Sequence, residues 1–584
     1  ETISPEQPAV AVVLCECAGE ISRTVDLEIV ARHAARLPGV HSVEVLPLAC
    51  LQAGQDRLRA ILRQQPVNRV LVGACTPRTH EPLFQRLVAE AGINPYLLEM
   101  VNLREQCAWV HPHDRDGATR KACEMIRLGV DRLHHSEPIH KIEREPVRSA
   151  LVIGGGVSGM TAALTIADVG YPVDLIEKTD ELGGNLHHIY YVAEPENPQR
   201  LARDLVNRVV GHEHIRLHLR SQVVQHRGSV GDFHTRVRSV LSDGRVREQD
   251  IQHGVVIVAT GGVESNARCY RLGEDPRIVR QSELEEILAH QPERATHLNS
   301  VVMIQCVQAE DRPEYCSRIC CTNTMKNALR LKMLNPSCQV VVLYKNIITY
   351  GFREQYYLEA RRQGVLFVRY TENEPPQVRL EPRGAHQAVV VSVNEHVFGR
   401  RLTFEPDLLA LSMSVDPSPE TARLAEVLNL PLSSEGFFME AHLKMRPMDF
   451  TDDGIFLAGM AHYPKFIEEC ITHAQAAAGR ALTILTRPMI QVGGVVAEVD
   501  PEKCTGCLTC VRTCPFSIPV VREDLTGVGG LVGAAWIDPA RCQGCGTCTA
   551  ECPARAIQLR HYRDEQIRIG LGQWETVQLT AVAG

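Results

Sequence analysis

Runs of apolar, β-branched residues alternate along residues 1–145 with stretches in which apolar residues recur every three or four positions. Short apolar runs predict buried strands, and the wider spacing predicts amphipathic helices. The expected strands are Val10 to Leu14, Val43 to Leu46 and Arg69 to Gly73, and the expected helices are Val25 to Arg36, Gln55 to Gln64 and His80 to Ala91. Alternating strands and helices indicate an α/β domain with a parallel sheet. We assign this N-terminal domain to residues 1–145.

A second α/β pattern surrounds a glycine loop. A short apolar run leads into Gly154-x-Gly156-x-x-Gly159, a helical pattern follows from Met160 to Val169, and the strand Val173 to Ile176 ends at Glu177. This order of strand, glycine turn, helix, strand and acid predicts a dinucleotide-binding fold. The glycines let the backbone approach a pyrophosphate at the helix N-terminus. Glu177 is placed to accept hydrogen bonds from a ribose.

The residues that follow this acid favour FAD over NAD. Lys178 and the run Gly183-Gly184-Asn185 resemble the FAD domain of flavoproteins with two dinucleotide folds, such as thioredoxin reductase. The alternative is that residues 149–184 bind NAD, as in a simple dehydrogenase. We assign the FAD domain to residues 146–490.

Two later runs fit the same resemblance. The run that ends in Thr260-Gly261-Gly262 corresponds to the strand that returns from a small insert, and the run that ends at Gly459 corresponds to the last strand beside the flavin. In those reductases an Asp follows the last glycine, whereas Met460 stands here. A helix expected from Ile467 to Leu485 would direct its N-terminus toward the flavin.

Flavoproteins of this kind carry a second Rossmann unit for NAD(P)H, expected here at about residues 290–410. The expected elements are a strand from Ser300 to Val307, a helix from Thr322 to Met333 and a strand from Gln339 to Tyr344. The glycine loop is replaced by Cys306-x9-Cys316-x3-Cys320-Cys321. We therefore expect no NAD(P) binding at this unit. Four thiolates suit a [4Fe–4S] cluster; the alternatives are buried apolar cysteines or a redox-active pair at Cys320 and Cys321.

The C-terminal residues 491–584 contain one cysteine pattern twice. Each run has the spacing C-x2-C-x2-C-x3-C-P, which is typical of ferredoxins with two [4Fe–4S] clusters. The fourth cysteine of each run ligates the cluster of the other run. One predicted ligand set is Cys504, Cys507, Cys510 and Cys552, and the other is Cys542, Cys545, Cys548 and Cys514. A disulfide framework is the alternative reading.

The N-terminal domain also contains cysteines. The candidates for a further cluster are Cys15, Cys17, Cys50, Cys75 and Cys107. Cys15, Cys50 and Cys75 follow strand ends, where side chains converge at one edge of a parallel sheet. The alternative is that they are small buried residues.

Composition narrows the class of protein. The 584 residues have a formal charge of −8 and a sequence pI of about 6.3, which argues against nucleic-acid binding. We expect no transmembrane segment and no signal peptide, because no apolar run approaches roughly 18 residues. The 21 cysteines suggest metal ligands in a reducing cytoplasm.

Several longer motifs point to one family. They are the stretch from Cys306 to Lys326, Gly436 to Pro447, Ala458 to Lys465, Thr76 to Pro82 and Asn102 to His111. These runs resemble the A subunit of heterodisulfide reductase, the flavin subunit of electron-bifurcating complexes. The resemblance implies a [4Fe–4S] cluster at the four cysteines of the second Rossmann unit and a further cluster in the N-terminal domain. It also implies that Gly459 and Lys465 bind the cofactor and that Lys326 lies near the isoalloxazine, although an ordinary solvated lysine is the alternative.

The predicted function follows from the cofactors. FAD exchanges electrons in pairs and [4Fe–4S] clusters exchange them singly, so we predict an electron-transfer subunit, with bifurcation or confurcation as one possibility. The resemblance implies B- and C-like subunits, a hydrogenase or dehydrogenase module and ferredoxin as partners, with a dimer inside a larger complex. Methanogen members carry an additional ferredoxin module in the flavin domain, but residues 185–255 contain no cysteine. The alternatives are a ferredoxin-dependent flavin disulfide reductase and a non-bifurcating wiring subunit.

Overall fold

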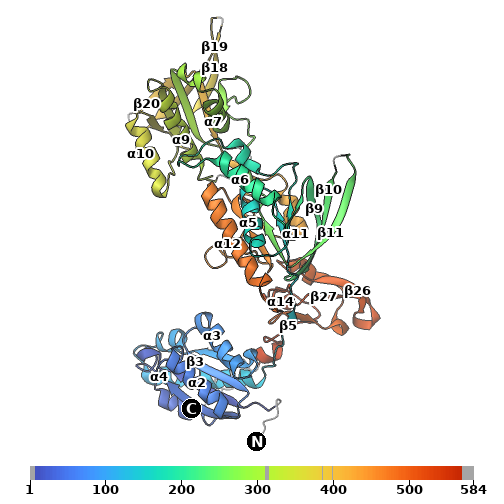
Figure 1. The fold of residues 1–584 in the computed structure, drawn as a ribbon. Helices are drawn as coiled ribbons and strands as arrows, with labels where there is room; N and C mark the ends of the chain where they lie inside the picture. The colour runs from blue at the N-terminus through green and yellow to red at the C-terminus, as the bar shows by residue number, and fades with distance from the viewer. Residues whose placement is uncertain (1–6, 242, 309–314, 385, 398, 569–584) are drawn as a thin grey trace. The chain divides into compact units, whose positions relative to one another are not determined.

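The computed structural model of the protein describes residues 7–241, 243–308, 315–384, 386–397 and 399–568 (Figure 1). The chain divides into two compact units. The first is formed by residues 1–142 and 491–584, and the second by residues 143–490. The chain passes from one unit to the other at β5 (Ile142–Arg144) and β24 (Ile490–Val492).

The N-terminal part of the first unit is a parallel four-stranded sheet in the order β2-β1-β3-β4. Its strands are β1 (Val10–Cys15), β2 (Val40–Leu46), β3 (Arg69–Ala74) and β4 (Leu98–Asn102). Helices α1 (Leu27–Ala34) and α4 (Arg115–His134) pack together on one face, and α2 (Gln52–Gln64) and α3 (Pro77–Glu90) pack together on the other. The central strands β1 and β3 are buried along their whole length, which explains their apolar runs.

The C-terminal part of the first unit contains two short helices and two antiparallel strand pairs. The helices are α13 (Thr509–Thr513) and α14 (Thr547–Ala550), which contact each other. The strand pairs are β25 (Ala497–Val499) with β28 (Ile557–Leu559), and β26 (Val520–Thr526) with β27 (Val532–Trp536). This part packs on the N-terminal part: the Gln566 amide donates to the His135 carbonyl at 2.7 Å, and the rings of Tyr96 and His561 meet edge to face.

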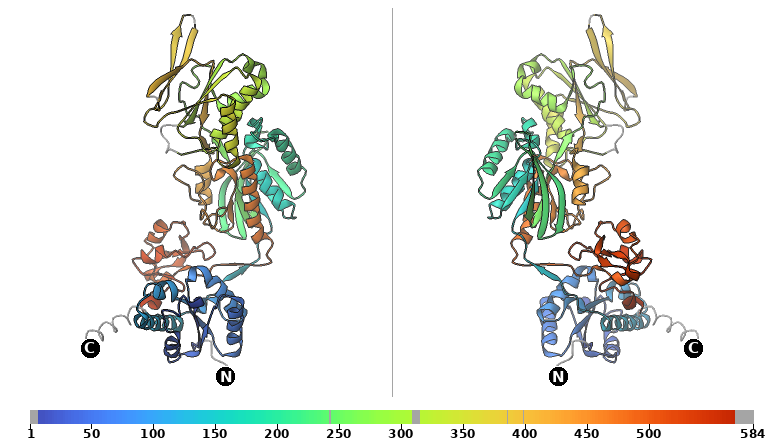
Figure 2. Two further views of the ribbon diagram at one scale, coloured as in Figure 1. Left: turned by 90° about the vertical axis from the view of Figure 1, so that its left-hand side faces the viewer. Right: turned by 90° about the vertical axis from the view of Figure 1, so that its right-hand side faces the viewer.

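The first half of the second unit has three layers (Figure 2). The middle layer is a parallel sheet in the order β23-β12-β6-β7-β8. Its strands are β6 (Ala150–Ile153), β7 (Val173–Ile176), β8 (Ile215–His218), β12 (Val255–Val258) and β23 (Ile455–Leu457). One face is covered by α5 (Val157–Ala167), α6 (Pro198–Val210) and α12 (Ile467–Leu485). The other face is covered by an antiparallel sheet of β9 (Ser221–Ser229), β10 (Asp232–Val240) and β11 (Val246–His253).

The second half of this unit repeats the three-layer arrangement. Its parallel sheet has the order β14-β21-β15-β16-β17. The strands are β14 (Ile278–Arg280), β15 (Ser300–Val307), β16 (Gln339–Tyr344), β17 (Leu366–Arg369) and β21 (Leu408–Met413). One face carries α7 (Gln281–His290), α8 (Pro292–Thr296), α9 (Cys320–Leu334) and α10 (Glu354–Arg362). The other face carries β18 (Gln377–Arg383), β19 (His386–Glu395) and β20 (Arg400–Phe404).

Short elements complete the second unit. The strands β13 (Gly262–Glu264) and β22 (Val415–Pro417) pair antiparallel, and α11 (Thr421–Leu428) packs against β9. Among the described residues, no helix combines the length and the apolar character that a bilayer crossing requires.

The predicted elements agree with the observed ones where apolar runs have sharp ends. β7, β15, β16 and α12 have the predicted bounds. α9 begins at Cys320 and not at Thr322, so the adjacent cysteines are its first two residues. The linker predicted from Leu133 to Arg148 begins inside α4. The predicted first and third domains share one compact unit, and the division into three domains stays a prediction.

Candidate functional site

The glycine loop joins β6 to α5 in the second unit. Gly154 has a φ of +112°, and a Cβ on it would lie 2.3 Å from the Ala259 carbonyl oxygen. A Cβ on Gly159 would lie 1.7 Å from the Gly154 carbonyl oxygen. These two glycines are therefore required by packing. A Cβ on Gly156, in contrast, would meet no neighbouring atom within 4 Å among the described residues, so this part of the loop faces open space.

Glu177 fastens the glycine loop from the end of β7. Its buried carboxylate accepts a hydrogen bond from the Gly155 N–H at 2.6 Å. The other carboxylate oxygen accepts bonds from the N–H and the hydroxyl of Thr179, each at 2.8 Å. A carboxylate offers about four lone-pair directions, so Glu177 retains capacity for a ribose hydroxyl.

A cavity opens beside this loop. It is lined by Gly154, Glu177, Lys178 and Thr260, and also by Ser221, Gln222, Ser418, Glu420 and Arg423. The Thr260 hydroxyl oxygen is buried and has no hydrogen-bond partner among the described residues. A buried polar atom without a partner is costly, so this hydroxyl suits a polar ligand group. The lining residues from β9 and from the segment that begins α11 could not be predicted because they come from distant parts of the chain.

The second glycine motif packs against the first. Gly183 has a φ of +124°, and its N–H donates to the Gly155 carbonyl at 3.0 Å. Gly184 lies so close to the loop that a Cβ on it would sit 3.3 Å from the Gly156 Cα. The Asn185 side-chain amide donates to the Gly262 carbonyl at 2.8 Å, so it fastens the turn after β12. The three predicted segments therefore meet at one place.

Gly459 and Lys465 lie together at the start of α12. The Lys465 ammonium donates to the Gly459 carbonyl at 3.2 Å and lies 3.2 Å from the centroid of the Tyr463 ring. Burial lowers the pKa of Lys465 to about 7. The Gly459 N–H donates to Nδ1 of His473, which fixes the neutral form of this imidazole as the acceptor.

Two buried histidines beside these residues were not singled out from the sequence. The rings of His462 and His473 stack with their centroids 5.5 Å apart, and Nε2 of His462 lies 2.7 Å from the Glu440 carboxylate. Burial lowers the pKa of each histidine to about 4. Nδ1 of His462 is buried without a partner among the described residues. Only Glu440, inside a predicted motif, had a signal in the sequence.

The cysteines of the second Rossmann-like half also gather. Cys306 ends β15 with a φ of +59°, Cys316 is exposed, and Cys320 and Cys321 begin α9. Their thiols are close enough to affect one another's ionisation: burial raises the pKa of Cys306, and Cys321 and Cys316 raise it further. A hydrogen bond from Cys320 lowers the pKa of Cys321. The structure therefore brings together the four residues of the predicted set.

Arg318 ties this cysteine segment to α12. Its guanidinium donates to the Tyr350 hydroxyl at 2.6 Å and to the Glu469 carboxylate at 3.0 Å. It also lies over the ring of Tyr463, 5.1 Å from the centroid. Arg318 therefore connects the predicted cluster site to the helix that carries the predicted flavin contacts. No motif in the sequence indicated this role.

Lys326 is not a solvated helix lysine. Only 4% of its side chain is exposed, and its ammonium lies 2.6 Å from the Glu285 carboxylate. The ammonium also donates to the Tyr191 carbonyl at 2.8 Å. Its proximity to an isoalloxazine stays a prediction.

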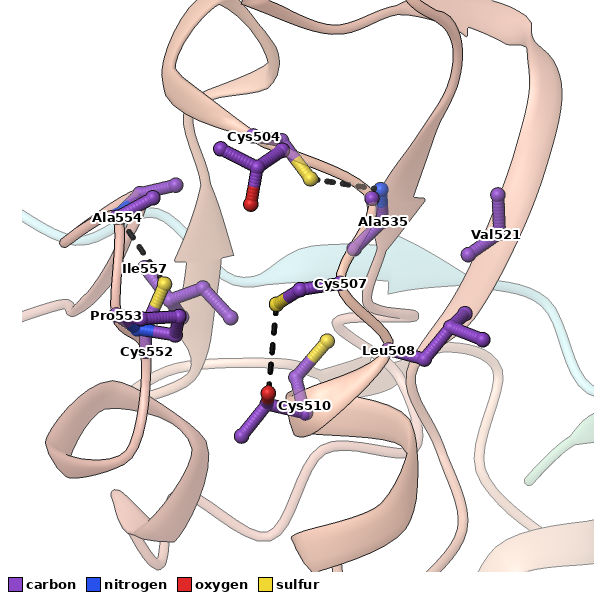
Figure 3. Close-up of a pocket in the computed structure, with 14 residues that line it drawn as sticks. Cys504, Cys507, Leu508, Cys510, Val521, Ala535, Cys552, Pro553, Ala554 and Ile557 are labelled. Atoms are coloured by element: carbon purple, nitrogen blue, oxygen red, sulfur yellow. Dashed lines mark hydrogen bonds between the residues drawn. The ribbon is translucent and has the colours of Figure 1, made fainter.

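The ferredoxin-like cysteines converge on two pockets in the first unit. Figure 3 shows the first, where Cys504, Cys507 and Cys510 of one run meet Cys552 of the other. The second pocket is lined by Cys542, Cys545, Cys548 and Cys514. Each run thus supplies three cysteines to one pocket and its fourth to the other, in the two sets of four that the spacing predicts.

Backbone amides already point at several of these sulfurs. The N–H groups of Ala535 and Ala556 donate to Sγ of Cys504 and Cys552 at 3.4 and 3.3 Å (the first is drawn in Figure 3). Burial, together with the neighbouring thiols, raises the pKa of Cys548 to about 12. Such a thiol loses its proton when a metal binds, because the thiolate is the ligand form.

Among the described residues, no three His, Cys, Asp or Glu side chains are close enough to share a single metal ion. A [4Fe–4S] cluster makes a different demand, because each thiolate binds a separate iron corner and the sulfurs surround the cluster. The two pockets, each walled by four sulfurs and apolar residues such as Ile557 and Ile537, fit that demand.

Four of the five N-terminal cysteines gather at the sheet edge after β1, β2 and β3. Cys15 Sγ accepts from the Cys17 N–H at 3.3 Å, and the Arg104 guanidinium donates to Cys17 Sγ at 3.2 Å. Cys50 and Cys75 are charge neighbours of Cys15 and Cys17, and burial raises the pKa of Cys75 to about 11. Cys107 instead donates its thiol to the Ala118 carbonyl of α4.

Known proteins share these features. Residues 152–201 match the family described as "NAD(P)-binding Rossmann-like domain", and residues 503–557 match "4Fe-4S dicluster domain". The topology and these matches confirm the predicted fold class, an α/β flavoprotein-type fold with a C-terminal dicluster domain.

Whole-length relatives have also been named. The A subunit of the CoB–CoM heterodisulfide reductase of Methanocaldococcus jannaschii, an iron–sulfur protein, is 32% identical over 96% of this chain and 97% of its own length. The second of the corresponding A subunits of Methanopyrus kandleri is 32% identical over 89% of this chain and 92% of its own length. Thioredoxin reductase of T. acidophilum is 14% identical, with a TM-score of 0.41, over 57% of this chain and 98% of its own.

Proposed function

Because the chain belongs to the family of heterodisulfide reductase A subunits, we propose that it is the FAD- and [4Fe–4S]-containing electron-transfer subunit of a heterodisulfide-reductase-like complex. The observation that carries this proposal is the convergence of four cysteines from two separate runs on each of two pockets. FAD supplies two-electron chemistry and the clusters supply one-electron steps.

The chain's own residues would divide the work as follows. The open face of Gly156 admits a pyrophosphate, Glu177 positions the loop and a ribose, and the Thr260 hydroxyl offers an unused donor. Gly459 and Lys465 would hold the flavin end. Arg318 would fix the spacing between the cysteines of α9 and that end.

The number of clusters is proposed from the cysteine sets. The two dicluster pockets and the set at Cys306, Cys316, Cys320 and Cys321 would hold three clusters. Cys15, Cys17, Cys50 and Cys75 would hold a fourth, whereas Cys107 lies against α4 and is a weaker candidate.

Partners are proposed from the family. A relative in Methanosarcina acetivorans is named as the A subunit of a "Ferredoxin/F(420)H(2)-dependent CoB-CoM heterodisulfide reductase". For this chain we propose ferredoxin, B- and C-like subunits and a hydrogenase or dehydrogenase module, with a dimer in a cytoplasmic complex. A non-bifurcating wiring role is the second candidate, because residues 185–255 lack the cysteines of an inserted ferredoxin module.

Anaerobic purification of the full chain tests the proposal. We expect about one FAD and at least roughly twelve irons per chain, from three or more four-iron clusters. Iron near eight in flavin-replete protein would remove the third cluster, and protein without flavin would overturn the assignment. Proteins that co-purify anaerobically, identified by mass spectrometry, distinguish the bifurcating complex from a wiring role.

A further inference from the structure

Lys326 and Glu285 form a buried ion pair between two helices. Lys326 lies on α9 and Glu285 on α7, and the ammonium and carboxylate are 2.6 Å apart. The side chains are 4% and 7% exposed. Burial lowers the pKa of Lys326, and the carboxylate of Glu285 opposes this change.

The pair is also bonded to the flavin-binding half. Glu285 accepts from the Tyr190 N–H at 2.8 Å, and the Lys326 ammonium donates to the Tyr191 carbonyl at 2.8 Å. The Tyr191 hydroxyl donates to the side chain of Asn327 at 2.7 Å. Tyr190 follows soon after the glycine motif that ends at Asn185. The pair therefore meets the chain segment that leads directly from the dinucleotide loop.

A buried ion pair needs an explanation other than stability. The cost of desolvating two charges largely offsets their attraction, and apolar residues of similar volume often stabilise a protein as well or better. Here each charge also has backbone partners from one segment, so the arrangement fixes where the ammonium sits.

We propose that Glu285 is a positioning residue that holds and partly neutralises Lys326, and that the pair thereby sets the two-electron reduction potential of the flavin. This inference rests on the proposed function, in which FAD is bound with Lys326 near its isoalloxazine. Oxidised flavin takes two electrons from reduced iron–sulfur clusters and one proton from solvent, which gives the anionic reduced flavin. The ammonium stabilises this anion and the carboxylate opposes it.

The two charges predict shifts of opposite sign. Lys326→Met removes the cation and lowers the flavin potential, whereas Glu285→Gln removes the anion and raises it. The double variant removes both charges and returns the potential close to that of the unchanged protein. Loss of packing alone would not produce opposite shifts that cancel.

The pH dependence gives a second signature. Other charges near the pair are Glu194, Arg330 and Arg353: Glu194 raises the pKa of Lys326, Arg330 lies over Tyr191, and Arg353 is paired with Glu194. In Glu285→Gln, Lys326 loses the partner that keeps it protonated. The raised potential should therefore be present at low pH and disappear as pH rises.

The experiment is anaerobic spectroelectrochemical titration of the full, FAD-loaded chain in four variants. They are Lys326→Met, Glu285→Gln, the double variant and Glu286→Gln, which removes the same charge at the next, exposed position of α7. Opposite shifts that cancel, with Glu286→Gln unchanged, support the proposal. A Glu285→Gln potential equal to that of Glu286→Gln overturns it.

Two further outcomes separate this inference from the proposed function. An unchanged potential in FAD-loaded Lys326→Met shows that the lysine is remote from the flavin, which overturns its proposed placement. If Glu285→Gln fails to hold FAD, the double variant, which leaves no unpaired buried charge, decides. A potential like that of the unchanged protein supports the inference, and one like that of Lys326→Met overturns it.

Discussion

The glycines of the dinucleotide loop have two different roles at the scale of single residues. Gly154 and Gly159 have no room for a Cβ because backbone carbonyls occupy that space. Gly156 has an extended backbone that any residue adopts, and the space beyond it is open. Folding therefore requires the first two glycines, and ligand access explains the third.

Gly156→Val should fold normally and lose FAD. The added methyl groups meet no described protein atom but enter the space proposed for the pyrophosphate, so FAD affinity should fall at least about tenfold, or roughly 1.4 kcal/mol. Flavin content and isothermal titration measure the change.

Gly159→Val is the matched control for that variant. Its Cβ collides with backbone, so it should destabilise the fold by roughly 3 kcal/mol or more. Thermal unfolding measures this difference. Full FAD occupancy in Gly156→Val would contradict the placement of the site.

The stacked histidines predict acid sensitivity of the flavin-binding half. The pKa values of His462 and His473 are lowered from 6.5 to about 4 by burial. The unfolded chain therefore binds protons in this window that the folded chain does not, and stability falls as pH falls from 6.5 to 4. The loss is on the order of 3 kcal/mol per histidine.

His473→Asn tests this dependence, because the amide oxygen can still accept from the Gly459 N–H but does not titrate. Its thermal midpoint, followed by flavin fluorescence, should fall less between pH 6.5 and pH 4 than that of the unchanged protein. His113→Asn, at an exposed position, should leave the pH profile unchanged. Parallel profiles for all three proteins would show that His473 does not carry the effect.

At the scale of elements, the sequence predicted buried strands better than half-buried ones. β15 and β16 consist of apolar runs with clear ends, and their bounds were predicted correctly. β10 alternates buried and exposed residues, with Phe233 and Val237 facing the core and arginines between them. Its many charged residues masked this period, so the sheet of β9, β10 and β11 was not predicted.

The site shows the same limit. Fixed spacing within one segment predicted the cysteine sets, because the loop geometry of a cluster is local. The partners Glu440, His473 and Arg318 come from separate segments that only the folded sheets bring together. Glu285 was missed for this reason too, since its partner Lys326 lies 41 positions away.

The exchange of cysteines between α13 and α14 predicts which variants act on one cluster. Cys514→Ser should remove about four irons per chain from the pocket of the other run. Adding Cys542→Ser should remove no more, because both residues line one pocket. Adding Cys504→Ser instead should bring the loss to about eight irons.

Iron analysis and EPR of the reduced protein measure these losses. Cys123→Ser, in α4, is the control and should keep all the iron. Equal losses in the two double variants would mean that each run holds its own cluster.

At the scale of the whole molecule, two similar three-layer halves differ at one loop. The first half keeps a glycine cradle after its first strand, and the second half has cysteines at the matching place, where the chain from Cys306 to Cys321 contains no glycine. A pyrophosphate needs close approach to backbone N–H groups, which bulkier residues prevent. One half is thus suited to a dinucleotide and the other to thiolate chemistry.

This difference predicts how the flavin is reduced. NADH or NADPH alone should not bleach the flavin of the isolated chain, because the second half cannot bind a nicotinamide next to it. Reduced ferredoxin should bleach it, since electrons can enter one at a time through the clusters. Anaerobic stopped-flow absorbance at the flavin band measures both reactions, with dithionite as the control that the flavin is reducible. Rapid stoichiometric bleaching by either nicotinamide, without partner proteins, would show that the second half still binds the dinucleotide and that its cysteines have a role other than replacing that site.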